Sequence, residues 1–428
     1  MQSTAQNAVP VPSTFERLFE VAGRYALSAC GPICISGAHF VAALLVLHTL
    51  SRAHFGLFSF VMTLVPFGIS AAAALVGAPT TIGIRGRGHL DDAELATFQK
   101  VNLLLSAFAF AVVSCSLLAC GLDVTAALLF GVYGAVMSLR WLARVHAYAT
   151  ETPARAAGSD AVYGALLLAG LGGLDLAGRL TLDNTAAILL ASALGSLAIF
   201  DRTYLIRQFA PSAKGSLAAY APVWRDLTRW SLLGVAASEV TVNAHAYFVT
   251  FFSGPGAFAL LALGSLLMRP ISLVLSSLPD VERPVMARAI GRGDLAGAYR
   301  AVKEFRTAAA AVLLGTIAIV AVLLVFFPEL ILKQGYDAGA AEAIVAIWVA
   351  IMAIRALRTP EAVFLQAAGE FQPLANISLK SAAVSLAATL VLLVAFGPIA
   401  SLFGIVAGDA VMTAGIFAGV RRWKRAHG

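Results

Sequence analysis

Residues 308–327 read AAAAVLLGTIAIVAVLLVFF, a run of apolar and small side chains that contains no charged residue. An α-helix rises 1.5 Å per residue, so a run of this length crosses the hydrocarbon core of a bilayer, which is about 30 Å thick. The bilayer core offers no water to backbone N–H and C=O groups, and a helix satisfies all of them internally. The stretch therefore predicts a membrane-spanning helix.

Similar runs recur along the whole chain of 428 residues. The composition agrees with them, because 60% of the residues are hydrophobic and only 12% are charged, too few to cover a water-soluble globule. We expect an all-α polytopic membrane protein with about twelve spanning helices, six in each half of the chain. The predicted spans are residues 26–50, 55–84, 101–121, 124–147, 161–178, 185–200, 230–252, 257–278, 308–327, 343–354, 377–396 and 399–420.

Basic residues are concentrated in one of the two sets of alternate loops. Of the 30 Lys and Arg residues, the other set holds only Arg52, Arg179 and Lys333. Loops rich in Lys and Arg stay in the cytoplasm, so the bias predicts a multi-pass protein of a bacterial inner membrane with both termini cytoplasmic. The net charge of +7 then follows from topology and from attraction to anionic lipid, and requires no nucleic acid.

These boundaries divide the chain into five parts. We expect a disordered cytoplasmic tail at residues 1–14, an N-terminal lobe at 15–200, a cytoplasmic linker at 201–229, a C-terminal lobe at 230–420 and a basic cytoplasmic tail at 421–428. The predicted loops on the far side are too short for a catalytic domain. Walker A, HExxH and GxSxG motifs are absent from the sequence, so we expect no enzyme, no catalytic residues, no metal site and no cofactor.

A short motif occurs once in each half of the chain. GRGHL at residues 86–90 matches GRGDL at 291–295, and each copy precedes a charged amphipathic stretch, at 91–100 and 296–305. The match favours an internal repeat, and hence two pseudo-symmetric six-helix lobes with a site between them. The alternative is that both copies are ordinary basic turns that happen to contain glycine.

The second copy belongs to a longer passage, LPDVERPVMARAIGRGD at residues 278–294. With twelve helices in two lobes, this passage resembles the polysaccharide transporter branch of the multidrug, oligosaccharidyl-lipid and polysaccharide exporter superfamily, the branch that contains O-antigen flippases. The resemblance implies a flippase that moves an undecaprenyl-diphosphate-linked oligosaccharide across the inner membrane by alternating access, for cell-surface polysaccharide export. It also implies a monomer that contacts membrane lipid, a polysaccharide polymerase and chain-length proteins.

A charge at mid-membrane costs at least about 2.5 kcal/mol, so ionisable residues inside the predicted spans are candidates for function. A guanidinium group presents a planar fork of donors that suits phosphate oxygens. We therefore predict substrate contacts for Arg269, Arg140, Arg24, Arg355 and His39. Arg269 precedes Pro270, which we expect to kink or open its helix. For Arg24 and Arg355 the alternative is that they snorkel to the membrane interface, and for His39 that it is a hydrogen-bonded core residue.

A second group of buried polar residues includes the carboxylates. Glu239, Asn243 and His245 lie in the seventh predicted helix and Asp409 lies in the twelfth. A buried carboxylate must either titrate or pair with a cation. Glu239 and Asp409 are therefore expected either to couple transport to a proton or a sodium ion or to form an ion pair with Arg269. The alternative for His245 is a hydrogen-bonded core position.

Two other transporter functions remain alternatives. A cation-coupled multidrug exporter of the same superfamily would need an acidic, aromatic cavity, whereas arginines outnumber carboxylates in the predicted spans. A flippase for peptidoglycan precursors usually has additional helices beyond twelve, for which the chain has no room.

Overall fold

The computed structural model describes residues 14–87, 90–150, 152–209, 215–330 and 337–427. All regular elements within these ranges are helices. The predicted disordered tail at 1–14 lies outside the described residues except for Thr14, where the first helix begins.

The first half of the chain forms the N-terminal lobe. Its helices are α1 (Thr14–Thr49), α2 (Arg52–Ala72), the π-helical η1 (Ala73–Gly77), α3 (Ala78–Arg87), α4 (Asp92–Ala119), α5 (Val124–Ala149), α6 (Pro153–Leu176) and α7 (Leu182–Leu197). Since α2 runs through η1 into α3, a single span covers Arg52–Thr81. The linker that follows is partly helical, with α8 (Arg202–Phe209), α9 (Leu217–Val223) and η2 (Trp224–Thr228).

The second half forms the C-terminal lobe. It contains α10 (Arg229–Ser253), α11 (Pro255–Leu267), α12 (Arg269–Gly291), α13 (Leu295–Phe326), the short η3 (Pro328–Leu330), α14 (Ala338–Ala367), α15 (Phe371–Phe396) and α16 (Leu402–His427). The predicted tenth span was the shortest, yet α14 has 30 residues. The prediction stopped too early because Arg355 and Arg358 interrupt the apolar run while the helix continues.

The helices are long enough to span a bilayer. Among the described residues, eight helices are long and apolar enough to cross a membrane, and α11 with α12 makes a ninth, bent span. Two shorter apolar helices, Ile33–Thr49 and Leu182–Leu197, occupy the positions of the first and sixth predicted spans. The helix α10 occupies the seventh position and carries the polar residues Glu239, Asn243 and His245.

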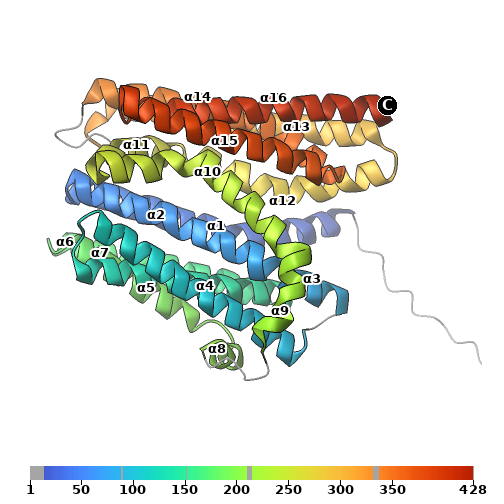
Figure 1. Ribbon diagram of the computed structural model, residues 1–428, viewed down its shortest axis with the longest axis horizontal. Coiled ribbons are helices and arrows are strands. Elements are labelled where there is room, and N and C mark those ends of the chain that lie inside the picture. Colours follow the sequence, from blue (N-terminus) through green and yellow to red (C-terminus); the bar gives the residue numbers. More distant parts are fainter. Residues whose placement is uncertain (1–13, 88–89, 151, 210–214, 331–336, 428) are drawn as a thin grey trace, which may run out of the picture.

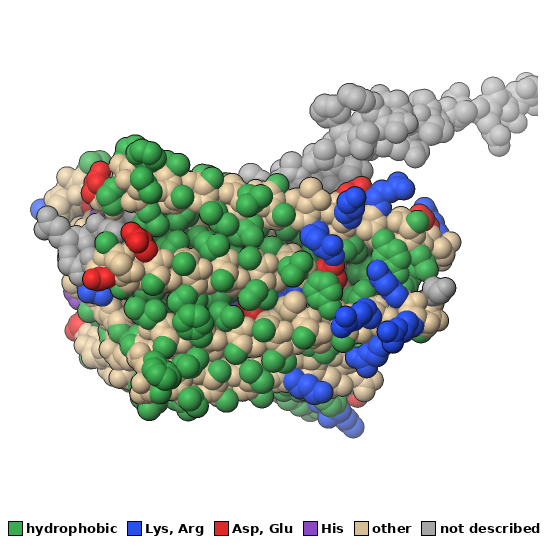
Figure 2. Space-filling view, turned by 90° about the horizontal axis from the view of Figure 1, so that it is seen from above, with side chains coloured by type: hydrophobic (Ala, Val, Ile, Leu, Met, Phe, Trp, Pro, Cys, Tyr) green, Lys and Arg blue, Asp and Glu red, His purple; other side chains and the backbone are tan. Residues whose placement is uncertain are grey.

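The two halves of the chain lie side by side as two helical layers (Figure 1). Lys and Arg side chains gather at one end of the molecule, the end at which α16 finishes (Figure 2). We call this the basic end and the opposite one the far end. Each lobe crosses the molecule repeatedly between these ends, which agrees with the predicted two-lobed, polytopic fold.

Aspartates define where several helices begin. Asp123 accepts hydrogen bonds from the backbone of Thr125 and Ala126, at 2.9 and 3.2 Å, and so caps α5 at the far end. Asp294 of the second GRGDL motif caps α13 at the basic end through the Gly297 N–H, at 2.8 Å. Gly293 precedes this cap with a φ of +75°, a conformation that favours glycine. This copy of the repeated motif is thus a helix-initiating turn.

The lobes are in contact through α2, which packs on α10 and α11. The aromatic ring of Phe60 on α2 makes edge-on contacts with Tyr247, Phe251 and Phe258 of the C-terminal lobe. Nearer the far end, the backbone of Gly56 lies against the carbonyl group of Pro255, the first residue of α11. A Cβ at position 56 would lie 1.8 Å from that oxygen, so only glycine allows this approach.

We predict that Gly56→Ala lowers the free energy of unfolding by about 1–3 kcal/mol, because the backbone atoms of Pro255 cannot move aside as a flexible side chain would. Thermal unfolding of the detergent-purified protein measures the effect. Gly68→Ala is the matched control on the same helix, since its new Cβ would meet only Ala109, at 3.8 Å. Equal unfolding temperatures for the two variants would contradict the importance of this contact.

Candidate functional site

The eighth span is broken at Arg269. The helix α11 ends at Leu267, α12 begins at Arg269, and the two helices are bent by 59° at the break. Pro270 has no backbone N–H to continue the hydrogen-bond ladder, which explains why the break occurs here. The predicted opening of the helix is confirmed, and it places the N-terminal dipole end of α12 beside the Arg269 side chain.

Arg269 lines two adjoining cavities. The larger has a volume of about 270 Å³, and its walls include Arg140, Arg144 and His39 together with Arg269. The smaller, of about 100 Å³, is lined by His39 and Arg269 among others. Among the described residues, neither lining includes Asp or Glu. Three of the predicted contact residues, Arg269, Arg140 and His39, are therefore brought together.

A buried carboxylate supports the arginines of the N-terminal lobe. Asp160 on α6 is fully buried, and its two oxygens contact Arg140 Nη2 at 2.6 Å and Arg144 Nη2 at 2.7 Å. The Nε of Arg140 also donates to the hydroxyls of Ser159 and Ser196, at 3.2 and 2.8 Å. These contacts fix the Arg140 guanidinium in place.

Tyrosine hydroxyls connect His39 to the arginine group. His39 Nε2 lies 2.7 Å from the Tyr163 hydroxyl, which lies 3.0 Å from the Tyr133 hydroxyl. The Arg140 guanidinium stands over the Tyr163 ring, 5.0 Å from its centroid. His39 is thus a hydrogen-bonded residue of the cavity wall, as its alternative interpretation expected.

The cavity carries an excess of positive charge. Three arginines line it, and Asp160 behind them compensates only one of those charges. Among the side chains that the structure describes, no carboxylate lies within ion-pair distance of Arg269, although this side chain is partly buried. A partly buried guanidinium without a counter-ion is a suitable place for an anionic ligand.

The C-terminal lobe repeats the arrangement of two arginines and one aspartate. Arg355 and Arg358 on α14 flank the fully buried Asp409 of α16, with Arg355 Nε at 2.8 Å and Arg358 Nη1 at 2.9 Å from its oxygens. Like α5, which carries Arg140 and Arg144, α14 is the fourth span of its lobe. The predicted pairing of Asp409 with Arg269 is wrong, because Asp409 is held within its own lobe.

The remaining predicted residues lie on α10. Glu239 accepts a hydrogen bond from Asn243 Nδ2 at 2.9 Å and another from the Tyr247 hydroxyl, so it is also not the partner of Arg269. His245 packs between the rings of Phe258 and Trp348. A role of Glu239, Asn243, His245 or Asp409 in ion coupling stays a prediction.

The structure separates Arg355 from the cavity around Arg269 and does not test the predicted contact of Arg24. Arg355 is in the ion pair with Asp409, although its Nη2 has no hydrogen-bond partner among the described atoms. The side chain of Arg24 lies outside the described part of α1. The sequence reading missed Asp160, because the predicted span began at 161 whereas α6 begins at Pro153.

We predict that Asp160→Asn lowers the free energy of unfolding by about 3–5 kcal/mol, since it leaves Arg140 and Arg144 buried without their counter-ion. Asp409→Asn should have the same effect in the other lobe. Thermal unfolding of the purified protein tests both variants. Asp183→Asn, an exposed change in the first turn of α7, should cost less than about 1 kcal/mol; similar losses for all three would refute the assignment.

Comparisons with known proteins identify the architecture. No family model matches the sequence, and no curated protein matches it. The fold matches an inward-facing multidrug resistance MATE family transporter of the MOP superfamily, with a TM-score of 0.65, 15% identity and coverage of 93% of this chain and 94% of that chain. An outward-facing MATE transporter of that superfamily matches with a TM-score of 0.59, 12% identity and the same coverage.

The lipid II flippase MurJ in an inward closed conformation also matches. Its TM-score is 0.68 at 12% identity, and the alignment covers 92% of this chain and 87% of that chain. Identities this low show the fold and not the cargo. The chain therefore has the two-lobed, all-helical fold of MOP superfamily transporters.

Proposed function

We propose that the protein is a flippase that moves an undecaprenyl-diphosphate-linked oligosaccharide across the inner membrane by alternating access, for export of a cell-surface polysaccharide. The observation that carries the proposal is Arg269, a partly buried arginine without an ion-pair partner among the described residues, at the broken span beside Arg140 and Arg144. In this proposal the basic end faces the cytoplasm, and the lipid tail stays in the bilayer while the headgroup passes between the lobes.

The charge of the cavity suits a diphosphate. A diphosphate esterified at both ends carries one negative charge on each phosphorus. The three arginines of the lining and the Asp160 behind them have a net charge of two positive units. The N-terminal end of α12 adds a helix dipole that favours anions at the same place. Half-helices that begin at mid-membrane serve anionic substrate groups in this way.

The size of the cavity limits how much of the cargo it can hold. A volume of about 270 Å³ is slightly below the range of small-molecule sites, which is about 300 to 1,000 Å³. It fits a diphosphate and not an oligosaccharide. The sugar must therefore occupy space that opens when the lobes separate, while the diphosphate stays at the arginines.

A peptidoglycan precursor is the second candidate cargo. It is suggested by the fold that this chain shares with the lipid II flippase MurJ, although that likeness does not by itself identify a cargo. The two candidates share the proposed recognition of a diphosphate and differ in the attached sugar. A cation-coupled multidrug exporter is less well supported, because a positively charged cavity repels cationic drugs.

Deletion of the gene, followed by lipid extraction, distinguishes these functions. We expect undecaprenyl-linked oligosaccharide to accumulate on the cytoplasmic face and surface polysaccharide to be lost. Accumulation of peptidoglycan precursor with lysis would assign the second cargo. Unchanged polymer with increased drug sensitivity would contradict both flippase assignments.

The residue-level prediction is that Arg269→Ala reduces polysaccharide export by about ten- to a hundredfold, because it removes charge-assisted hydrogen bonds worth about 1.5–3 kcal/mol. Export is measured in the deletion strain complemented with each variant, at matched protein levels. Arg288→Ala, an exposed arginine on the same helix, is the control and should export normally. Normal export by Arg269→Ala would remove this residue from the substrate site.

A further inference from the structure

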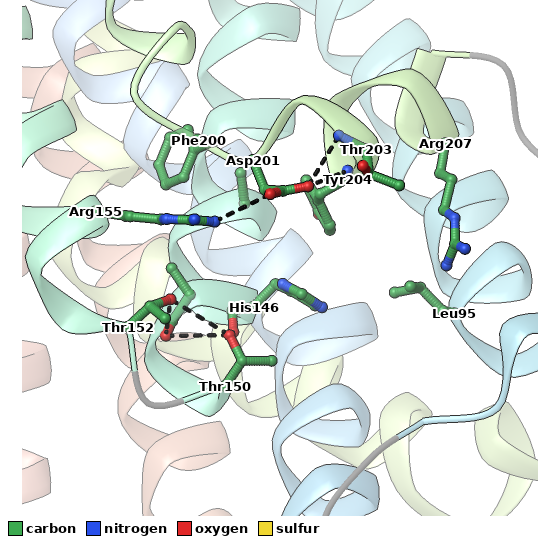
Figure 3. A pocket seen from close by; sticks show the side chains of 12 residues that line it. Leu95, His146, Thr150, Thr152, Arg155, Phe200, Asp201, Thr203, Tyr204 and Arg207 are labelled. Atoms are coloured by element: carbon green, nitrogen blue, oxygen red, sulfur yellow. Dashed lines mark hydrogen bonds and ion pairs between the residues drawn. The ribbon is translucent and has the colours of Figure 1, made fainter.

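A separate cavity lies at the basic end of the N-terminal lobe, between α4, α5, α6 and α8. Its volume is about 270 Å³, and its polar walls include His146, Thr150, Thr152, Arg155 and Arg207 together with the carboxylate of Asp201. Figure 3 shows these side chains around one opening, with Arg155 and Arg207 on opposite sides and His146 between them. The proposed transport site shares no residue with this lining.

Both arginines in this cavity keep donors available. Arg155 contacts Asp201 through Nη1 at 3.3 Å, and Arg207 contacts Asp92 through Nη1 at 3.0 Å. A guanidinium has five N–H donors, so most of them have no partner among the described residues in each case. The two side chains are 47% and 49% exposed, and exposed ion pairs of this kind contribute at most about 1 kcal/mol. An incoming phosphate could therefore compete for both.

Asp201 has hydrogen-bond donors other than Arg155. Its Oδ1 accepts the backbone N–H groups of Thr203 and Tyr204, at 2.8 and 3.1 Å, where it caps α8. These bonds, above all the one from Tyr204, hold the pKa of Asp201 below its usual value. Arg155 can consequently turn to another anion while Asp201 stays ionised at the start of α8.

The helix α8 beside this cavity is amphipathic. The helix α8 combines Arg202 and Arg207 with the exposed apolar side chains Ile206 and Phe209, which are 57% and 52% exposed. A short amphipathic helix of this type lies along the boundary between headgroups and acyl chains. A lipid whose tails pack beside Ile206 and Phe209 would bring its phosphate to Arg207.

The C-terminal lobe also has a basic cavity. Its volume is about 220 Å³, and its charged lining consists of Lys303, Arg306, Lys424 and Glu361, with Arg306 bonded to Glu361. It lies between α13, α14 and α16, the third, fourth and sixth spans of the lobe. The first cavity shares the third and fourth spans of its lobe with this arrangement but is also lined by α6, the fifth span. Each lobe thus has one basic cavity beside its third and fourth spans.

We propose that these two cavities bind the phosphate groups of anionic phospholipids, one in each lobe, at the basic end of the molecule. Basic pockets between spanning helices on the cytoplasmic side are suited to such headgroups. In the first cavity Arg155, Arg207 and His146 contact the phosphate, while the hydroxyls of Thr150 and Thr152 donate to the backbone carbonyls of His146 and Ala147. In the second cavity Lys303 and Lys424 take the place of the arginines. This inference does not rest on the proposed cargo.

Native mass spectrometry of the full-length protein in neutral detergent tests the proposal, with dioleoyl phosphatidylglycerol as probe and dioleoyl phosphatidylcholine as reference. We expect two tightly bound phosphatidylglycerol molecules in the wild type. The double changes Arg155→Gln with Arg207→Gln, and Lys303→Gln with Lys424→Gln, should each remove one of them. Each affected site should bind at least about tenfold more weakly, since every basic residue contributes about 1 kcal/mol.

The matched controls are Arg225→Gln on η2 and Arg300→Gln on α13, exposed residues outside both linings. Weakening by the controls equal to that by the double variants would overturn the proposal in favour of diffuse surface charge. Displacement of the lipid by equimolar glycerol 3-phosphate would also overturn it, because the sites would then bind soluble phosphate. If the double variant fails to fold, the single change Arg155→Gln replaces it, because this side chain is only half-buried. We expect it to weaken phosphatidylglycerol binding about fivefold. Unchanged binding by this variant would refute the first site.

Discussion

The cost of placing a charge in hydrocarbon governs this structure. A bare ion at mid-bilayer is costly, so charged side chains in spanning helices must find partners or water. Arg140 and Arg144 find one in Asp160, and Arg355 and Arg358 find one in Asp409. Each carboxylate is shared by two guanidiniums, and both carboxylates are fully buried. The same solution in both lobes indicates that each six-helix unit is assembled around its own ion cluster.

Arg269 departs from this pattern, and the departure defines the proposed site. Pro270 breaks the helix at this position, and the Arg269 residue beside the break lines the cavity. Irregular backbone at membrane depth is tolerated where it lines a cavity, and two cavities adjoin it here. The rigid partners of Arg140, namely Asp160, Ser159 and Ser196, hold the opposite wall in place. Arg140, held by its partners, and Arg269, at the broken helix, thus line the same cavity.

The sequence predicted the helical fold, the two lobes and the break at Pro270, because hydropathy and proline chemistry act locally along the chain. Of the five residues predicted to contact the substrate, Arg269, Arg140 and His39 line one cavity, whereas Arg355 does not. The partner of Asp409 was predicted wrongly, since the choice between Arg269, Arg355 and Arg358 depends on how helices are rotated in the bundle. Asp160 was missed because α6 starts before the apolar run. The predicted span began a few residues too late, so Asp160 was assigned to a loop and not to a buried helix.

The shared carboxylate in the N-terminal lobe has an electrical consequence for the proposed transport cycle. Because Asp160 neutralises only one of three arginines, the empty cavity is cationic, whereas a cavity that holds a doubly charged diphosphate is neutral. The membrane potential contributes about 2.3 kcal/mol per elementary charge for each 100 mV that the charge crosses. In the proposed cycle, reorientation of the loaded carrier would then be insensitive to voltage, while an interior-negative potential would favour return of the empty carrier towards the cytoplasm.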